Sequence, residues 1–302
     1  MVDDERSCPA CREEHAPGSP DCPASRVGEL IAGRYRIIRM LGAGGMGAVY
    51  KAKKQPLGNW VAVKLLLPKY VGHAPTMERF VAEASATAVI EHPGVVRIVD
   101  LIEHSDVGPV IEMEWLEGKN LAQLIESGPF SIDEAVETTI GALDALSAIH
   151  ATRMIHRDIK PENLFRDRRG QVKVLDLGIA KNTRKGTAAG PLGFFGTVYY
   201  ASPEHCRKPT DVGFASDIYS MGVVLFQLLS GRLPVEEEDD LQQVTSVMSG
   251  RIRRRPSAHR AEIPPWLDGC DAVVMAGPSA PGQSIEAIRG AVPPSSLDRR
   301  DY

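Results

Sequence analysis

The first part of the chain carries its apolar residues in short runs, several of which alternate with polar residues. Alternation over 34–41 and apolar clusters over 60–66, 95–102 and 109–114 predict four strands. Between them, the alanine-rich stretch 77–90 predicts a helix. Strands therefore dominate this part of the chain.

After Gly118 the apolar residues follow a helical spacing, which predicts helices over 120–127, 132–151 and 211–230. In the second of these, six apolar residues fall close to one face: Ile132, Val136, Ile140, Leu143, Leu146 and Ile149. The layout is a small β-rich lobe followed by a larger, mainly helical lobe. This is an α+β fold with two lobes.

The cysteines and prolines mark the domain boundaries. Three of the five cysteines lie in the first 22 residues, among prolines and glycine, which favours a separate cysteine-rich element. The predicted organisation is a cysteine-rich element at 1–25, a linker at 26–33, a main domain at 34–290 with lobes 34–117 and 118–290, and a tail at 291–302.

Composition narrows the class of protein. The 302 residues are 43% hydrophobic and 25% charged, with a net charge of −4, which excludes a disordered chain and argues against a dedicated nucleic-acid binder. No apolar run is long enough to span a bilayer, and the first residues lack a secretory signal. An odd cysteine count argues against a disulfide framework. The expectation is a cytoplasmic protein with reduced thiols.

Two features of the β-rich lobe suggest phosphate chemistry. A glycine-rich loop over 42–49 lets backbone N–H groups approach phosphates without obstruction by a Cβ atom, although a plain hairpin turn explains such a loop equally well. The chain continues as strand after the loop, which argues against a dinucleotide-binding loop.

Lys64 lies within an apolar strand, and burial of its charge requires a partner of opposite charge. Glu83, on the predicted helix, is the candidate.

A more specific pattern follows in the helical lobe. The run 155–164, IHRDIKPENL, is followed by 173–178, KVLDLG, so that Asp176 stands thirteen residues after Asn163. With the glycine loop and strand lysine ahead of it, the chain resembles the protein kinase family, and its GAGGMGAVYKA loop and SPE triplet at 202–204 are most similar to bacterial members. The lysine two residues after Asp158 resembles serine/threonine kinases. DLG replaces the more usual DFG.

The resemblance implies a role for each of the charged residues. Lys64, oriented by Glu83, would hold the α- and β-phosphates of ATP. Asp158 would accept the proton of the substrate hydroxyl, and Lys160 would lie beside the γ-phosphate. Asn163 and Asp176 would bind Mg²⁺, with Mn²⁺ as an alternative. Asp217 resembles the aspartate that steadies the catalytic loop.

The same resemblance implies a nucleotide pocket. Val49, Ala62 and Phe165 would sandwich the adenine, and Met113 would be the gatekeeper of a hinge whose backbone at Glu114 and Leu116 reads the adenine edge. The full set of predicted nucleotide-binding residues is Leu41, Gly42, Ala43, Gly44, Gly45, Met46, Gly47, Ala48, Val49, Ala62, Lys64, Glu114, Leu116, Asn120 and Phe165.

Regulation is predicted from Arg157, which precedes Asp158. This arginine would pair with a phosphothreonine of the activation loop, and Thr183 or Thr187 is the candidate, although both could be ordinary loop residues. Thr197 resembles the threonine that contacts Asp158 and Lys160. Glu204 should lack the arginine that usually pairs with it, since the stretch 277–284 replaces the segment that would carry one.

The N-terminal cysteines have two interpretations. Cys8, Cys11, His15 and Cys22 could hold zinc, since a CxxC turn presents two thiolates to one metal. Their spacing departs from the usual CCHC knuckle. A tail with three reduced thiols explains the same residues.

The sequence thus predicts a serine/threonine protein kinase that transfers the γ-phosphate of ATP to protein hydroxyls and phosphorylates its own activation loop, through a transient homodimer. Protein substrates are the expected partners, with no membrane and no nucleic acid. Two alternatives stay open: a pseudokinase scaffold that binds nucleotide without turnover, and a zinc-knuckle interaction module regulated by the kinase domain.

Overall fold

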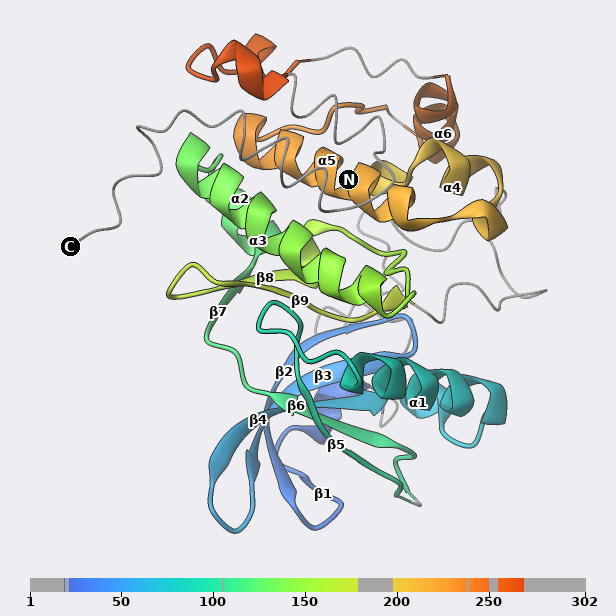
Figure 1. Cartoon of the computed structure of the whole chain (residues 1–302). Helices are drawn as coiled ribbons and strands as arrows, with labels where there is room; N and C mark the ends of the chain where they lie inside the picture. Colours follow the sequence, from blue (N-terminus) through green and yellow to red (C-terminus); the bar gives the residue numbers. More distant parts are fainter. Residues whose placement is uncertain are drawn as a thin grey trace. The chain divides into compact units, whose positions relative to one another are not determined.

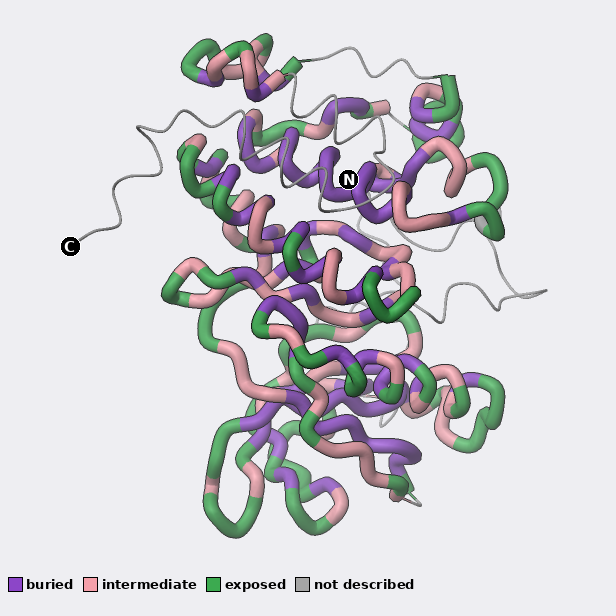
Figure 2. The backbone as a smooth tube through the Cα atoms, in the orientation of Figure 1, coloured by how far each residue is buried: buried purple, intermediate pink, exposed green. Residues whose placement is uncertain are grey.

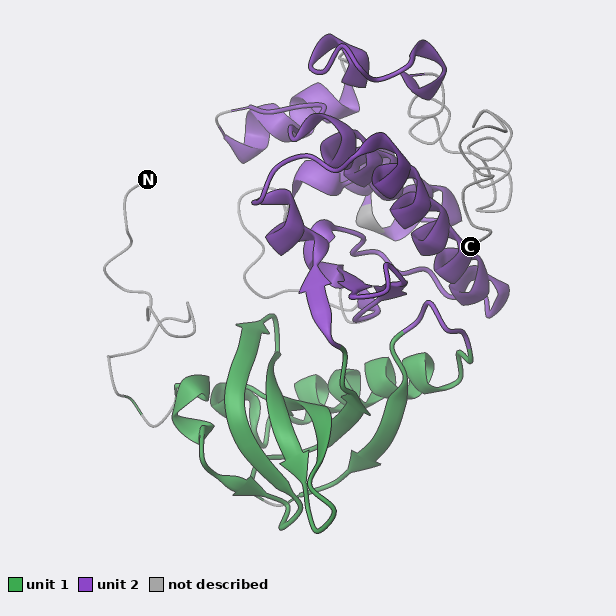
Figure 3. Ribbon diagram, turned by 90° about the vertical axis from the view of Figure 1, so that its left-hand side faces the viewer, with its two compact units in different colours: residues 1–91, 96–116 green, residues 92–95, 117–302 purple. Residues whose placement is uncertain are grey.

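The computed structural model describes residues 19, 22–104, 106–178, 198–237, 239–249 and 255–268. They fall into two compact units, coloured separately in Figure 3. Unit 1 takes in the described residues up to Glu91 together with Val96–Leu116. Unit 2 takes in His92–Val95 and the described residues from Glu117 onward.

Unit 1 is built on a six-stranded antiparallel sheet in the order β1-β2-β3-β4-β6-β5 (Figure 1). The strands are β1 (Leu30–Ile31), β2 (Tyr35–Gly44), β3 (Gly47–Lys54), β4 (Asn59–Leu66), β5 (Ile98–Ile102) and β6 (Val110–Glu114). Short 3-10 helices precede β1 and follow β4, at Pro23–Arg26 (η1) and Pro68–Tyr70 (η2). The four predicted strands are present.

Alternation of buried and exposed residues explains how the sheet of unit 1 packs. Tyr35 and Ile37 of β2 are buried while Arg36 and Ile38 are exposed, because successive strand residues point to opposite faces. Helix α1 (Ala74–Ala88) overlaps the predicted range 77–90 but begins three residues earlier and ends two residues earlier, and it buries Phe80 and Glu83. The helix contacts β5.

Unit 2 is mainly helical and carries a three-stranded sheet in the order β7-β8-β9. The strands are β7 (Gly118–Asn120), β8 (Leu164–Asp167) and β9 (Val172–Val174), and the helices are α2 (Leu121–Ile125), α3 (Ile132–Ala151), α4 (Pro203–Arg207), α5 (Phe214–Ser230) and α6 (Asp240–Met248). Single 3-10 turns occur at Pro161–Asn163 (η3), Val198–Tyr200 (η5), Pro209–Asp211 (η6) and Pro256–Ala258 (η7).

Helices α3 and α5 form the centre of unit 2. They pack against each other, and α5 is buried along nearly its whole length, as Figure 2 shows. Helix α3 begins at the predicted residue because Ser131 and Glu134 form a reciprocal capping box. None of the helices described is long and apolar enough to cross a membrane.

Candidate functional site

The glycine-rich loop joins β2 to β3 in unit 1. Gly45 has a φ of +58°, which glycine adopts without strain. At Gly47 a Cβ atom would lie 2.9 Å from the Leu65 carbonyl oxygen and 3.1 Å from the Phe80 ring, so only glycine fits. At Gly42 and Gly44 a Cβ atom would meet no atom of the described residues within 4 Å. Packing against the described residues therefore does not explain these two glycines, and it leaves open space beside the loop backbone.

The predicted ion pair is present in unit 1. The Lys64 Nζ lies 2.9 Å from Glu83 Oε1, and each side chain is only 11% exposed. The strand register sets Val49 opposite Lys64, and sets Lys51 and Met113 on either side of Ala62. Because opposed residues share a face, Val49, Ala62, Lys64 and Met113 lie on one face of the sheet.

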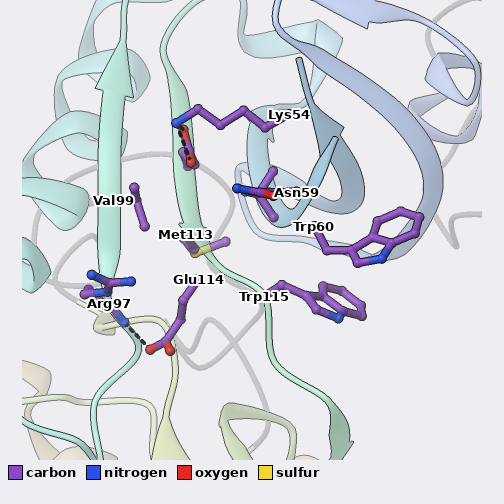
Figure 4. Close-up of a pocket in the computed structure, with 10 residues that line it drawn as sticks. Lys54, Asn59, Trp60, Arg97, Val99, Met113, Glu114 and Trp115 are labelled. Atoms are coloured by element: carbon purple, nitrogen blue, oxygen red, sulfur yellow. Dashed lines mark hydrogen bonds and ion pairs between the residues drawn. The ribbon is translucent and has the colours of Figure 1, made fainter. Parts of the chain in front are cut away.

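The predicted hinge follows β6. The Glu114 N–H donates to the Arg97 carbonyl oxygen at 3.0 Å, and the Glu114 carboxylate accepts from the Arg97 N–H at 2.8 Å. Figure 4 shows Glu114 beside Arg97, and Trp115 directed away from them, in a hollow of about 520 Å³ in unit 1. The Leu116 backbone has no hydrogen-bonding partner among the residues described.

The loop that carries Asp158 lies within unit 2 and brings three predicted residues together. The Asn163 amide nitrogen donates to the Asp158 carbonyl oxygen at 2.7 Å and to Asp158 Oδ2 at 3.0 Å. The Lys160 Nζ lies 3.5 Å from the same carboxylate oxygen. Because the amide nitrogen of Asn163 is engaged with Asp158, its Oδ1 is turned toward the opposite side. Two hydrogen bonds therefore hold Asp158 and Asn163 together.

Asp217, in the first turn of α5, binds the backbone of this loop. Its carboxylate is buried, and accepts the backbone N–H groups of His156 and Arg157, each at 2.8 Å. The His150 Nε2 donates to the same carboxylate at 2.7 Å. The sequence predicts the role of Asp217 but gives no signal for His150, which lies 67 residues away on α3.

His156 supports the loop from a second side. Its Nε2 donates to the Leu175 carbonyl oxygen at 2.8 Å, and its Nδ1 accepts the Asp158 N–H at 3.2 Å. Two such bonds require the tautomer with the proton on Nε2. The ring, which is fully buried, therefore ties the segment around Asp158 to the segment before Asp176.

Asp176 and Arg157 have strained backbones. Both have positive φ values, +38° and +66°, which are costly for residues with a Cβ atom. Gly178 fixes the turn after Asp176: its N–H donates to the His156 carbonyl oxygen at 2.9 Å, and a Cβ atom there would lie 2.8 Å from that oxygen. Strain of this kind concentrates at functional sites.

The Arg157 side chain is a partly buried cation whose hydrogen-bonding capacity is not fully used by the described residues. Its Nε is buried and has no hydrogen-bonding partner in the part of the chain that the structure describes. Desolvation by burial lowers the pKa of the guanidinium, and the negative charge of Asp217 partly opposes this shift. An anion next to this group would relieve both costs.

Asn120 and Phe165 are opposed residues of β7 and β8 in unit 2. Asn120 also caps α2, since its side chain accepts the Gln123 N–H at 2.8 Å and Gln123 returns a bond to its backbone. This structural role accounts for the residue type at position 120 without a ligand.

Six predicted residues fall outside the described part of the chain: Cys8, Cys11, His15, Thr183, Thr187 and Thr197. Of the candidate zinc ligands only Cys22 is described, and it is buried in unit 1. In the described ranges no three His, Cys, Asp or Glu side chains cluster as metal ligands. Mg²⁺ held by Asn163, Asp176 and the phosphates of a nucleotide does not need such a cluster.

Protein kinase domains combine several of the features described above. In this chain a glycine-rich hairpin is followed by a strand lysine that pairs with a helical glutamate. One loop of unit 2 then carries a hydrogen-bonded Asp–Asn pair, and the next carries a strained aspartate. The family model described as "Protein kinase domain" matches residues 35–270. The chain belongs to this family.

Named relatives come from bacteria. The chain is 38% identical over 238 residues to the serine/threonine-protein kinase PrkC of Bacillus subtilis, covering 78% of this chain and 36% of that protein. It is 34% identical over 245 residues to PknA of Mycobacterium tuberculosis, covering 80% and 56%. The chain thus spans about a third of the length of PrkC and about half of that of PknA.

A solved structure gives the same fold. The kinase domain of Mycobacterium tuberculosis PknI matches with a TM-score of 0.64 and 23% sequence identity, covering 88% of this chain and 98% of that one. The two-lobed α+β fold predicted from the sequence is confirmed.

Proposed function

We propose that residues 34–290 form an active serine/threonine protein kinase domain. A substrate hydroxyl oxygen bonds to the γ-phosphorus of ATP, the bond from that phosphorus to the bridging oxygen breaks, and ADP leaves. The hydroxyl proton passes to Asp158. The observation that carries the proposal is the hydrogen-bonded pair of Asp158 and Asn163, preceded in the chain by His156 and Arg157, whose N–H groups donate to the buried Asp217 carboxylate.

The roles proposed in unit 1 concern the nucleotide. Lys64 holds the α- and β-phosphates, because its pairing with Glu83 fixes the ammonium group where it is shielded from water. Val49 and Ala62 contact the adenine from the face of the sheet that also carries Lys64. The open surroundings of Gly42 and Gly44 leave the loop backbone accessible to phosphate oxygens.

The roles proposed in unit 2 concern proton and metal. Asp158 orients the hydroxyl, and Lys160 neutralises charge near the γ-phosphate. Asn163 Oδ1 and the Asp176 carboxylate are hard oxygen ligands and fit Mg²⁺, with Mn²⁺ as an alternative. When bound, the ion neutralises the phosphate oxygens. Phe165 and Asn120 are proposed to contact adenine and ribose.

Phosphoryl transfer is tested by incubating the chain with labelled ATP and Mg²⁺, alone and with a generic protein substrate. We expect phosphoserine and phosphothreonine but no phosphotyrosine, and no label with Asp158→Asn. Nucleotide binding measured on both proteins should be similar, because Asp158 acts on the hydroxyl. Binding without turnover in the unsubstituted protein would favour the pseudokinase scaffold and overturn the proposal.

Activation by phosphorylation is proposed on the basis of Arg157. A phosphothreonine at Thr187 or Thr183, formed by transfer between two copies of the chain, supplies an anion for the buried Nε, which has no partner among the described residues. Mass spectrometry after autophosphorylation should find one of these threonines modified. Arg157→Lys should keep the charge but lose most of the activation, because lysine lacks the Nε–H and the forked guanidinium.

Zinc at Cys8, Cys11, His15 and Cys22 remains a separate proposal, supported by the CxxC spacing. Metal analysis of the protein purified without chelator tests it, with Cys8→Ser/Cys11→Ser as the comparison. One equivalent of zinc, lost in the double variant, is the expected result.

We also propose that the kinase domain works in the cytoplasm, because its proposed substrate is ATP with Mg²⁺.

A further inference from the structure

A short segment ahead of the matched kinase family region is fastened to the strand that leads into the glycine-rich loop. We call residues 22–31 the strap. Its last two residues form β1, which pairs with the start of β2. Further along, the Gly28 N–H donates to the Ile37 carbonyl oxygen and the Ile37 N–H donates to the Glu29 carbonyl oxygen, both at 2.9 Å.

Side chains of the sheet also bind the strap. The Tyr50 hydroxyl, buried on β3, donates to the Pro23 carbonyl oxygen at 2.8 Å. Arg36 donates from Nη1 to the Gly28 carbonyl oxygen at 2.9 Å. The strap is thus anchored to both strands that flank the glycine-rich loop, by backbone and side-chain bonds.

The strap reaches the loop itself through Cys22. This side chain is 6% exposed and packs with Met40 and Ala43. Ala43 is the residue between Gly42 and Gly44, so the contact falls on the loop segment whose glycines have open surroundings. Cysteine behaves here as a small apolar residue that fills the space beside Ala43.

The strand beneath the strap is irregular. The pairing of β2 with β3 shifts register between Ile37 and Arg39 and again between Met40 and Gly42. Such irregularities weaken the ladder that would otherwise hold the loop in place. The strap bonds at Ile37, before the first irregularity, and packs at Ala43, after the second, so it spans the weakened part of the strand.

We propose that the strap positions the glycine-rich loop for nucleotide, with Cys22 as a positioning residue that acts through Ala43. A loop rich in glycine loses much conformational freedom when its backbone closes on phosphates. A segment that restrains the loop before binding removes part of that entropic cost and tightens affinity. The inference rests on the proposed function only in taking the ligand to be a nucleotide phosphate.

The test is a double-substitution cycle on Cys22→Ala and Ala43→Gly. The affinity of the full chain for ADP with Mg²⁺ is measured by calorimetry, which does not require phosphoryl transfer. We expect each single substitution to weaken binding by about three- to tenfold, and the double variant to lose clearly less than the product of the two factors, because both remove one contact. Losses that multiply fully would overturn the proposal.

Three further variants separate positioning from general stability. Cys22→Val keeps an apolar side chain and should retain most of the affinity. Because valine cannot bind zinc, this variant also separates packing at position 22 from the proposed zinc site. Val27→Ala, at an exposed position in the same strap, should not change the affinity. Tyr50→Phe removes the hydrogen bond to the Pro23 carbonyl oxygen and serves if Cys22→Ala fails to fold. A lower melting temperature with unchanged ADP affinity in the folded variants would refute positioning.

Hydrogen exchange gives a readout free of any ligand. Amides of residues 41–48 should exchange faster in Cys22→Ala than in the unsubstituted protein, while amides of α5 keep their rates. If the loop amides exchange equally in both proteins, the strap does not restrain the loop. If ADP fails to bind any of the proteins, the proposed function fails, but the exchange result still decides whether the strap acts on the loop.

Discussion

At the scale of single residues, one buried carboxylate supports the strained part of the catalytic loop. Asp217 is 1% exposed and accepts three hydrogen bonds, one of them from the N–H of Arg157, whose φ is positive. The bonds offset the cost of this backbone conformation, because they are made only when the residue adopts it. Asp217 thus positions Asp158 indirectly, through its hydrogen bonds to the two preceding residues of the loop.

Asp217→Asn should lower both stability and activity. The carboxamide loses the negative charge and turns an N–H₂ group toward donors, so we expect a loss of about 3 kcal/mol in the free energy of unfolding. Urea denaturation measures it, and kinase activity should fall well beyond the loss of folded protein. Asp144→Asn, at an exposed carboxylate on α3, is the control. An unchanged unfolding midpoint would contradict this account.

Cys206 of α4 should be unreactive near neutral pH. Burial raises the pKa of its thiol to about 11, and the nearby Glu204 adds to the shift. The nucleophile is the thiolate, so alkylation by iodoacetamide should be slow at pH 7 to 9 and accelerate as the pH approaches 11. Peptide mass spectrometry measures the rate at this residue, with urea-unfolded protein as the comparison. Rapid labelling of the folded protein at pH 7.5 would contradict the prediction.

At the scale of elements, the first turn of α3 carries a pH-dependent contribution to stability. Hydrogen bonding from the Ser131 hydroxyl is the main cause that lowers the pKa of Glu134, with its backbone bond and Arg166 adding to it. A carboxyl group whose pKa is lower in the folded state stabilises the fold above its unfolded pKa. This contribution is lost as the pH falls through the folded pKa.

Ser131→Ala should therefore destabilise the protein by about 1 kcal/mol at pH 7, as the loss of a helix cap usually does. The difference should shrink as the pH falls through the lowered folded-state pKa of Glu134, because the carboxyl group is then protonated in both proteins. Urea denaturation at a series of pH values measures it. Ser127→Ala, exposed and outside a helix cap, is the control. A difference that grows in acid would refute the sign.

Local patterns predicted most of these elements, but not their long-range pairings. The helix over 132–151 matches α3 because its apolar spacing and its cap agree. By contrast, residues 26–33, predicted as a linker, contain β1, whose two residues are too few to carry a pattern. The contact of Cys22 with Ala43 likewise depends on how the chain folds back, which no local pattern encodes.

Glu204 illustrates the same point within the site. The sequence indicated a carboxylate without its usual arginine. In the structure, Ser216 donates to Glu204 Oε1 at 2.5 Å. Ser216 is also at the third position of α5, where its hydroxyl accepts the Gly213 N–H. The sequence does not reveal that Ser216 both caps α5 and binds Glu204, because serine is common at helix starts for capping alone.

At the scale of the whole molecule, ligand binding should stabilise the fold only when metal is present. ADP at about 100 times its dissociation constant adds roughly 2.7 kcal/mol of stability by mass action. We expect a clear rise in melting temperature with ADP and Mg²⁺, and most of it should vanish with EDTA. Asp176→Asn should show little metal-dependent rise, since it removes one proposed ligand. A full rise in that variant would contradict the assignment of Asp176.

Some glycines of the glycine-rich loop are needed for folding and others are not, and this difference affects how such a domain can evolve. Gly47 is required by the packing of the protein itself and Gly45 by its φ of +58°, whereas a Cβ atom at Gly42 or Gly44 would meet no described atom within 4 Å. Selection for folding alone therefore leaves positions 42 and 44 free to drift. A lineage released from catalysis would lose these two glycines first and keep the other two. Loss of nucleotide binding with the fold retained thus lies within one or two substitutions of this sequence.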